Sequence, residues 1–300
     1  MTDQHRPASA PIPIALTLDH APSVATSAHT AFDGARLDRA REQLQRAQIR
    51  HCTAFVVGHR ASGHERSLER WLAAGYELGN AGYEGRNASS AGTDAFMTDV
   101  ERCDALLRSL GAFDGHRPRF FRFPLGDRGA NANARHQLLH AIQDLGYTIA
   151  DVSIDFYDHC YETQHAHACA SDRGRARAIE RRYLHNVEGR VRWTGRVGRT
   201  RWGLRHVHIA ACDLGPFNER TLPEALQRLA PLVAWKPLAL AVFQPAYLRF
   251  HFDYERNGPI GEQLQRSLAH LALRPFARLS CKTRCFAQSA LGPRWPHLTG

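Results

Sequence analysis

Lysine is almost absent from this sequence of 300 residues. Of its 39 basic residues, only Lys236 and Lys282 are lysines, and the others are arginines. A codon bias explains this skew as well as a need for guanidinium groups does, so the net charge of +10 does not by itself indicate a nucleic-acid partner. No run approaches the roughly 18 apolar residues of a membrane span. Residues 1–13 lack an apolar core behind a basic head, so we expect neither a signal peptide nor a membrane protein.

Other familiar sequence patterns are missing as well. The seven cysteines are odd in number and scattered, unlike the paired cysteines of a small secreted domain. We therefore expect free thiols and a cytoplasmic protein. Phosphate-binding loops, dinucleotide fingerprints and the G-x-S-x-G nucleophile elbow are absent too. The remaining composition, with 43% hydrophobic and 23% charged residues, is typical of a soluble globular chain.

The sequence does contain a regular alternation of short apolar runs and amphipathic segments. Strands are predicted over 12–18, 52–57, 76–78, 119–123, 147–156, 206–211 and 238–243. Helices are predicted over 35–48, 67–74, 93–110, 134–145 and 222–233, with a long basic helical stretch before residue 206. This alternation indicates a parallel sheet, open or closed into a barrel. Such folds build their functional sites at the carboxyl ends of the strands.

The predicted strand ends carry a series of motifs. In chain order these are Thr17–Pro22, Gly79–Gly85, Phe121–Gly126, Ile154–His159 and Ile209–Asp213. In this order and at this spacing they resemble the five motifs of the NodB-type polysaccharide deacetylases, carbohydrate esterase family 4. The resemblance covers about residues 12 to 247 and implies an α/β fold, a distorted (β/α) barrel. We expect a disordered tail over 1–11, this domain over 12–250, and a helical extension with a tail over 251–300.

The resemblance also implies a chemistry. Members of this family remove an N-acetyl group with a divalent metal, typically zinc. By position, Asp19 corresponds to the catalytic base, Arg122 to the residue that tethers this base, and Asp158 to the carboxylate that orients the catalytic acid. Substrate contacts are predicted for four further residues in these motifs: Tyr83, Phe123, Pro124 and Asp155.

The departures from the family pattern fall on the metal and on the acid. His20, Ala81 and Gly85 stand where the family has its three metal ligands, Cys212 stands at the acid, and His159 replaces a tryptophan. Alanine and glycine have no donor atom, and a zinc site needs three or four protein ligands. We therefore expect no zinc and no metal-dependent mechanism.

Substitute ligands are one alternative. His165 and Cys169 are four residues apart, a spacing that puts both on one helix face and that permits chelation. The same spacing fits a solvated helix surface, and no second cluster supports a metal site. His206 and His208 share one face of a strand before its end, so we expect them to be buried in the sheet.

Thiol chemistry is another alternative. In the predicted barrel, Cys212 and His20 lie at the same mouth, where Asp19 or Asp158 could complete a nucleophilic triad. Equally, Cys212 could pack as a small apolar residue, as most free cysteines do. The predicted catalytic set is therefore Asp19, His20, Arg122, Asp158 and Cys212.

Most of the positive charge lies in one segment. Residues 172–205 hold eleven arginines and three acidic residues, which makes +8 of the total of +10. With aromatic residues interleaved, the segment could bind an anionic ligand or could simply be a solvated helix. Nucleic acid is disfavoured, because no recognised binding motif accompanies the charge. The expected partner is a sugar-like or anionic small molecule, or an acidic protein.

Three functions remain open on the sequence. The leading hypothesis is a protein that is inert in the family reaction and binds a glycan, a metabolite or a protein. The alternative is a hydrolase that cleaves amide C–N bonds of an N-acetylated sugar or related metabolite without the usual zinc. The third is an ordinary deacetylase with substitute metal ligands.

Overall fold

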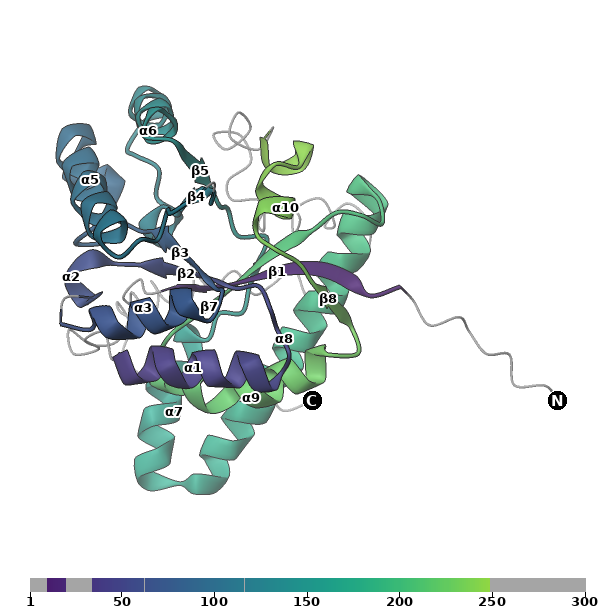
Figure 1. Cartoon of the computed structure of the whole chain (residues 1–300). Helices are drawn as coiled ribbons and strands as arrows, with labels where there is room; N and C mark the ends of the chain where they lie inside the picture. Colours follow the sequence, from purple (N-terminus) through teal and green to yellow (C-terminus); the bar gives the residue numbers. More distant parts are fainter. Residues whose placement is uncertain (1–9, 20–33, 62, 116, 249–300) are drawn as a thin grey trace.

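The computed structural model describes residues 10–19, 34–61, 63–115 and 117–248. Its centre is a curled, parallel sheet with the strand order β5-β4-β3-β2-β1-β7-β6, and β8 pairs with the start of β1 (Figure 1). The strands are β1 (Ile12–Asp19), β2 (Thr53–Val56), β3 (Glu77–Asn80), β4 (Arg119–Phe121), β5 (Tyr147–Ile149), β6 (Ile154–Asp155), β7 (His208–Asp213) and β8 (Val233–Trp235). The α/β fold of a distorted barrel is thereby confirmed.

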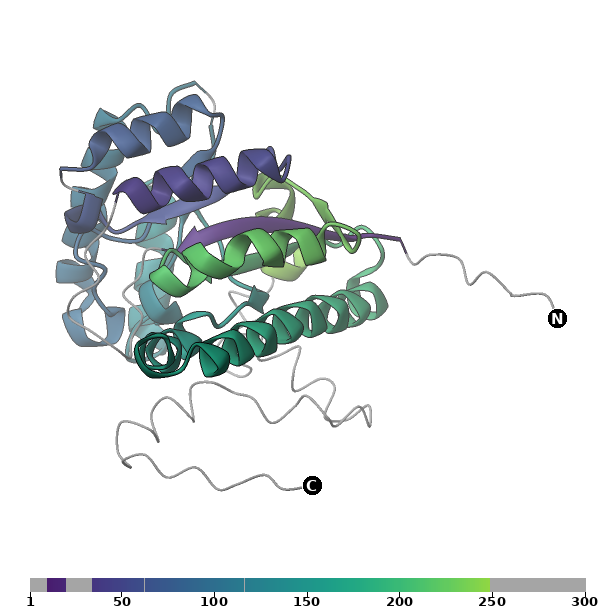
Figure 2. The same cartoon turned by 90° about the horizontal axis from the view of Figure 1, so that it is seen from below.

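Helices cover the outer face of this sheet (Figures 1 and 2). They are α1 (Gly34–Arg46), α2 (Gly58–Ala61), α3 (Glu65–Ala73), α4 (Ala88–Ala91), α5 (Thr93–Ser109), α6 (Ala132–Asp144), α7 (His159–Ser171), α8 (Arg173–Trp202), α9 (Pro216–Leu229) and α10 (Ala239–Val242). In Figure 2, α8 runs along the molecule next to α9, and α1 lies beyond α9. The helices α7 and α8 form a hairpin whose turn projects from the sheet in Figure 1.

Alternation along β1 separates two cores. Leu16 and Leu18 belong to the outer core, which the sheet shares with α1, α8 and α9. Ala15 belongs to the inner core, together with Phe55 and Ile209. Because successive side chains of a strand point to opposite faces, Asp19 shares the inner face with Ala15. The carboxyl end of β1 therefore presents Asp19 to the inside of the curled sheet.

The predicted strand 147–156 is in fact two strands at opposite edges of the sheet. β5 pairs with β4, whereas β6 pairs with β7. Between them the Ala150 N–H donates to Phe121 O at 2.8 Å and the Ser153 N–H donates to Ile209 O at 3.0 Å. The chain thus crosses the opening of the half-barrel within four residues, and this crossing brings β6 next to β7.

Near the end of the domain, one predicted helix is confirmed with different bounds and one predicted strand is wrong. The helix predicted over 222–233 begins earlier, at Pro216, and ends at Leu229. Proline suits a first helical turn because that turn has no intrahelical acceptor for its N–H. The strand predicted over 238–243 is the short helix α10, and β8 takes the place beside β1 instead. Apolar runs this short are compatible with a buried helix turn as well as with a strand.

The expected domain limits, membrane topology and free thiols can be compared with the structure only in part. Residues 251–300 and nearly all of 1–11 lie outside the described residues, so the predicted domain limits remain predictions. Among the described helices, none is long and apolar enough to cross a membrane. Four cysteines are free, as expected: Cys52, Cys103, Cys169 and Cys212. Cys160 is disulfide-bonded, so the expectation of free thiols is wrong for this residue.

Candidate functional site

The carboxyl ends of β1, β6 and β7 bring a group of charged side chains together. Asp19 and Asp213 are register partners at the ends of β1 and β7. Asp155 ends β6, and Asp158 and His159 follow it at the start of α7. Arg122, just after β4, reaches Asp19 across the sheet. We call these six residues the strand-end cluster: Asp19, Arg122, Asp155, Asp158, His159 and Asp213.

An ion pair between Arg122 and Asp19 lies at one side of the cluster. The Arg122 Nη1 group donates to Asp19 Oδ1 and also to Thr17 Oγ1 at 2.8 Å, and Nε donates to Ala150 O at 3.0 Å. The guanidinium carbon lies 4.0 Å from the ring centre of Phe55. Within the described residues, buried Nη2 has no acceptor. Arg122 is therefore held firmly beside Asp19, and its Nη2 group can still donate a hydrogen bond to a ligand.

Asp19 has an unusual affinity for a proton. Burial raises its pKa to about 6, against the lowering effect of Arg122, and the charges of Asp213 and Asp155 add to the rise. A carboxyl group with this pKa exchanges its proton near neutral pH, as a general base must. The ion pair and the pKa together are consistent with the position of a base that a cation tethers.

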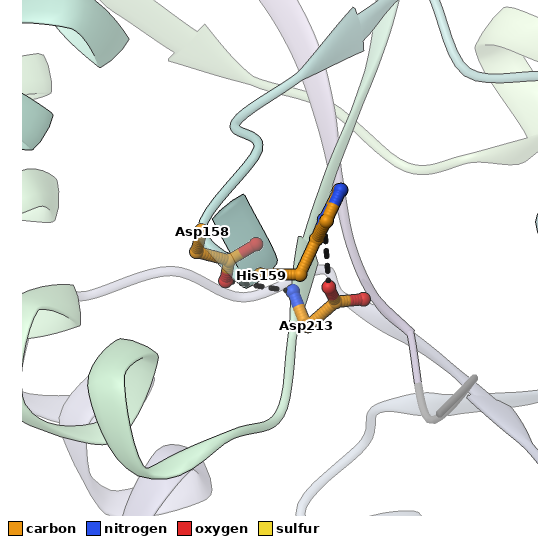
Figure 3. Close-up of side chains that lie close together, drawn as sticks. All are labelled: Asp158, His159 and Asp213. Carbon is orange, nitrogen blue, oxygen red and sulfur yellow. Dashed lines mark hydrogen bonds and ion pairs between the residues drawn. The ribbon is translucent and has the colours of Figure 1, made fainter. Parts of the chain in front are cut away.

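The other side of the cluster is formed by Asp158, His159 and Asp213 (Figure 3). His159 Nδ1 lies 3.1 Å from Asp213 Oδ2, and the backbone N–H of Asp213 donates to Asp158 Oδ2 at 2.8 Å. Burial lowers the pKa of His159, but the contact with Asp213 and the charges of Asp155 and Asp158 outweigh it and raise the pKa to about 9. Burial, and next the charge of Asp213, raise the pKa of Asp158 well above its usual value.

Asp155 connects the cluster to an aromatic side chain. Its Oδ1 accepts a hydrogen bond from the Tyr157 N–H at 2.7 Å, and Tyr157 has a left-handed backbone with φ of 56°. Few non-glycine residues adopt this conformation, so the surrounding contacts must hold it. One such contact is the guanidinium of Arg190 on α8, 4.2 Å from the ring centre of Tyr157. Burial raises the pKa of Asp155.

Comparison with known proteins finds a family model that is similar to slightly less than half of the chain. Residues 8–150 match the family model of polysaccharide deacetylase. Over this range the chain is similar to the polysaccharide deacetylase family. No curated protein matches the chain in sequence.

Solved structures support the same family fold. They include the Bc1960 peptidoglycan N-acetylglucosamine deacetylase, at 16% identity and a TM-score of 0.52 over 76% of this chain and 87% of that one. The peptidoglycan deacetylase PdaC from Bacillus subtilis has 16% identity and a TM-score of 0.50 over 87% and 96%. A mutant of BA3943, a CE4 family pseudoenzyme, has 14% identity and a TM-score of 0.50 over 74% and 63%. At these identities the likeness shows the fold alone, and the chain spans less than two thirds of the BA3943 structure.

The deacetylase family's zinc can be tested against the residues present. His20 lies outside the described residues. Ala81 is buried in the inner core. Gly85 has φ of 65°, and a side chain larger than hydrogen would be crowded there, because an added Cβ would lie 3.1 Å from Val57 Cγ1. Neither offers a donor atom. Zinc needs at least three protein ligands, so the residues at the positions that the sequence resemblance assigns to the metal do not fit the ion.

Three predicted substrate contacts lie in well-packed surroundings. The Tyr83 ring lies 3.9 Å below the Arg102 guanidinium and packs so closely on Gly58 that an added Cβ there would lie 2.5 Å from its Cδ2. Phe123 is 4% exposed and stacks on Phe96, and Pro124 is buried as well. Strand alternation explains this, because Arg122 faces inward and its neighbour Phe123 faces the helices. Of the four predicted contacts, Asp155 lies in the strand-end cluster.

The prediction that Cys212 faces the mouth of the barrel is wrong. Cys212 is 2% exposed and packs in the outer core, with Sγ 3.8 Å from Thr17 O. Burial raises the pKa of its thiol well above the usual value, which disfavours the thiolate that a nucleophile requires. Asp213, the next residue, faces the inside instead. Strand parity could have identified Asp213, because Asp19 and Asp213 are in register.

The remaining histidine predictions have mixed outcomes. His206 and His208 are buried, as predicted, with ring centres 4.7 Å apart. His165 Nε2 lies 2.7 Å from Glu180 Oε1, and Cys169 Sγ lies 3.6 Å from the same nitrogen. In the described part of the chain, however, the group of three donor atoms close enough for one metal ion is Asp158, His159 and Asp213.

Proposed function

We propose that this polysaccharide deacetylase relative binds an N-acetylated, sugar-like ligand at the strand-end cluster and does not perform the zinc-dependent family reaction. One observation carries the proposal. Ala81 and Gly85 supply no metal ligand at the family's positions, whereas the Asp19–Arg122 ion pair is in place at the strand ends. The site has therefore lost family metal ligands and has kept groups that bind polar ligands.

The chemistry of the cluster suits a sugar. Carboxylates accept hydrogen bonds from hydroxyl and amide N–H groups, and a guanidinium donates to carbonyl or hydroxyl oxygens. Arg122 Nη2 is buried and has no acceptor in the described residues, so a ligand oxygen there would satisfy it. Structural relatives include a peptidoglycan N-acetylglucosamine deacetylase, and oligomers of N-acetylglucosamine are therefore the first probe.

The test measures binding and hydrolysis on the same samples. Calorimetric titration with N-acetylglucosamine oligomers should show binding to the full chain. Asp19→Asn should weaken it by about 10- to 100-fold, which corresponds to the 1.5–3 kcal/mol of a hydrogen bond to a charged group. The control is Asp144→Asn, which changes an exposed carboxylate at the end of α6. Absence of binding, or acetate release that added zinc stimulates, would contradict the proposal.

A second candidate is metal-independent hydrolysis of the N-acetyl amide. The pKa of Asp19, at about 6, favours it, because such a carboxylate can accept a proton from water near neutral pH. The water oxygen would add to the amide carbonyl, and the C–N bond would break as the leaving amine takes up a proton. In this case the wild type releases acetate in the presence of a chelator, and Asp19→Asn releases none. If only binding is observed, the first proposal stands and this one fails.

A further inference from the structure

Three potential metal ligands from two segments of the chain meet in the strand-end cluster. One donor atom each from Asp158, His159 and Asp213 lies within 4.8 Å of the other two. His159 Nδ1 and Asp213 Oδ2 are 3.1 Å apart. Donor atoms of a tetrahedral zinc site lie about 3.3 Å from one another, given bonds of about 2.0 Å. Small movements of these side chains would therefore surround one ion. Figure 3 shows His159 against the Asp213 carboxylate and Asp158 beside the Asp213 backbone nitrogen.

An independent observation points to a missing partner at this place. Asp158 is 2% exposed, and its Oδ2 accepts the hydrogen bond from the Asp213 N–H. Its other oxygen, Oδ1, is buried and has no hydrogen-bond partner in the described residues. A buried carboxylate oxygen without a partner is costly. Figure 3 shows this second oxygen on the side of His159, where a cation would satisfy it.

The charge of the surroundings also favours a cation. Asp155, Asp158 and Asp213 bring three carboxylates to the single imidazole of His159, and all three act electrostatically on it. Arg190 acts on Asp155, and Arg122 is already paired with Asp19. Carboxylates that are buried or half-buried therefore outnumber the cations that face them, and charges withdrawn from water normally require pairing or a metal ion.

We propose that Asp158, His159 and Asp213 bind a divalent transition-metal ion. One imidazole and two carboxylates suit Zn²⁺ or Mn²⁺, since nitrogen donors favour the first and oxygen donors the second. The site uses none of the family's positions at residues 20, 81 and 85. Three protein ligands leave coordination positions for water or for an oxygen of a bound ligand.

The test uses the full chain after removal of metal with a chelator. Zinc chloride and manganese chloride are titrated separately by calorimetry, and one ion per chain should bind. Asp213→Asn and His159→Gln should each weaken this binding by at least about 10- to 100-fold, the loss already seen when only a group supporting a ligand is removed. The control is His136→Gln, because exposed His136 and His140, with Nε2 atoms 2.9 Å apart, could bind an ion adventitiously.

The results that support the metal site differ from those that overturn it. Binding that both cluster variants lose and that His136→Gln keeps supports the proposal. Absence of binding by the wild type, or equal binding by wild type and cluster variants, overturns it. Circular dichroism checks that each variant is folded, and if one cluster variant fails to fold, the other decides. Sugar binding by metal-free protein and its response to Asp19→Asn are measured separately, so either proposal can fail without the other.

Discussion

At the end of β1, the buried carboxyl group of Asp19 links folding to pH. Its pKa in the folded protein is about 6, above the ordinary value of 3.8. A raised carboxyl pKa contributes stability that is fully present below pH 4 and is lost as the pH rises through 6. The ionised form of Asp19, which the proposed binding or acid–base chemistry requires, thus destabilises the fold at neutral pH.

We therefore expect Asp19→Asn to stabilise the protein at high pH. The pKa shift corresponds to about 3 kcal/mol at most, at 1.36 kcal/mol per unit. The unfolding free energy of the variant should exceed that of the wild type at pH 8 by up to this amount, with a smaller difference at pH 5. Urea denaturation at both pH values measures it. A variant that is less stable than the wild type at pH 8 would show that the lost contact with Arg122 dominates.

A second prediction at the residue scale concerns thiol reactivity. Cys212, Cys52 and Cys103 are buried, and burial raises the pKa of each thiol, whereas Cys169 is exposed. Because the thiolate is the reactive species, Cys169 should be alkylated rapidly in the native protein and the other three only after unfolding. Peptide mass mapping after brief iodoacetamide treatment measures this. Rapid labelling of Cys212 would restore it as a candidate nucleophile.

Cys212 also shows where motif matching fails. The motifs identified the correct strand end, and they brought Asp19, Arg122 and Asp158 to one cluster. They did not report which side of the strand each residue occupies. A shift of one residue along a strand moves a side chain to the other face, so Cys212 lies in the outer core and Asp213 inside. The role of Asp213 required the register of β1 with β7.

Among the elements, α8 packs against β1 through a glycine. An added Cβ on Gly195 would lie within 3.0 Å of three atoms of Ile12, at 2.5, 2.7 and 2.8 Å. Gly189, on the same helix, has nothing within 4 Å of such an atom. Alanine substitutions at the two glycines therefore distinguish the effect of close packing, at Gly195, from the effect of helix propensity alone, at Gly189.

Gly189→Ala should stabilise the protein by about 1 kcal/mol, the difference in helix propensity. Gly195→Ala gains the same propensity but forces atoms into a packed core, and overpacking typically costs about 1–3 kcal/mol. We expect it to be destabilising on balance. Thermal and urea unfolding of both variants measure the two effects. If Gly195→Ala were as stable as Gly189→Ala, the contact between α8 and Ile12 would have to be looser than these distances indicate.

The element predictions fail where tertiary context decides. The sequence 147–156 alternates apolar and polar residues with no glycine or proline to interrupt it, so its local pattern predicts one strand. It is divided into β5 and β6 only because its first part pairs with β4 and its last part pairs with β7, at opposite edges of the sheet. Long amphipathic segments such as α5, by contrast, were predicted almost to the residue, because their periodicity extends over several turns.

On the scale of the whole molecule, the positive charge is concentrated on one element. The +8 of residues 172–205 falls almost entirely on α8, whose exposed arginines include Arg181 and Arg182. Arg190 of the same helix packs on the ring of Tyr157, and the Tyr157 N–H donates to Asp155 of the strand-end cluster. The basic surface of α8 is thus connected to the strand-end cluster by direct contacts. An acidic ligand bound at the cluster would be attracted by the positive charge of α8.

We expect Arg181→Glu combined with Arg182→Glu to weaken binding of an acidic oligosaccharide by about tenfold at low salt. Exposed ion pairs contribute about 0.2–1 kcal/mol each, and a reversal replaces attraction with repulsion. The effect should fade as salt screens the charges, and a neutral N-acetylglucosamine oligomer should bind as before. Arg50→Glu with Arg66→Glu is the matched control, because these exposed arginines lie elsewhere and the charge change is the same. Equal losses in both double variants would mean that only net charge matters, whereas unchanged binding would make α8 a solvated surface.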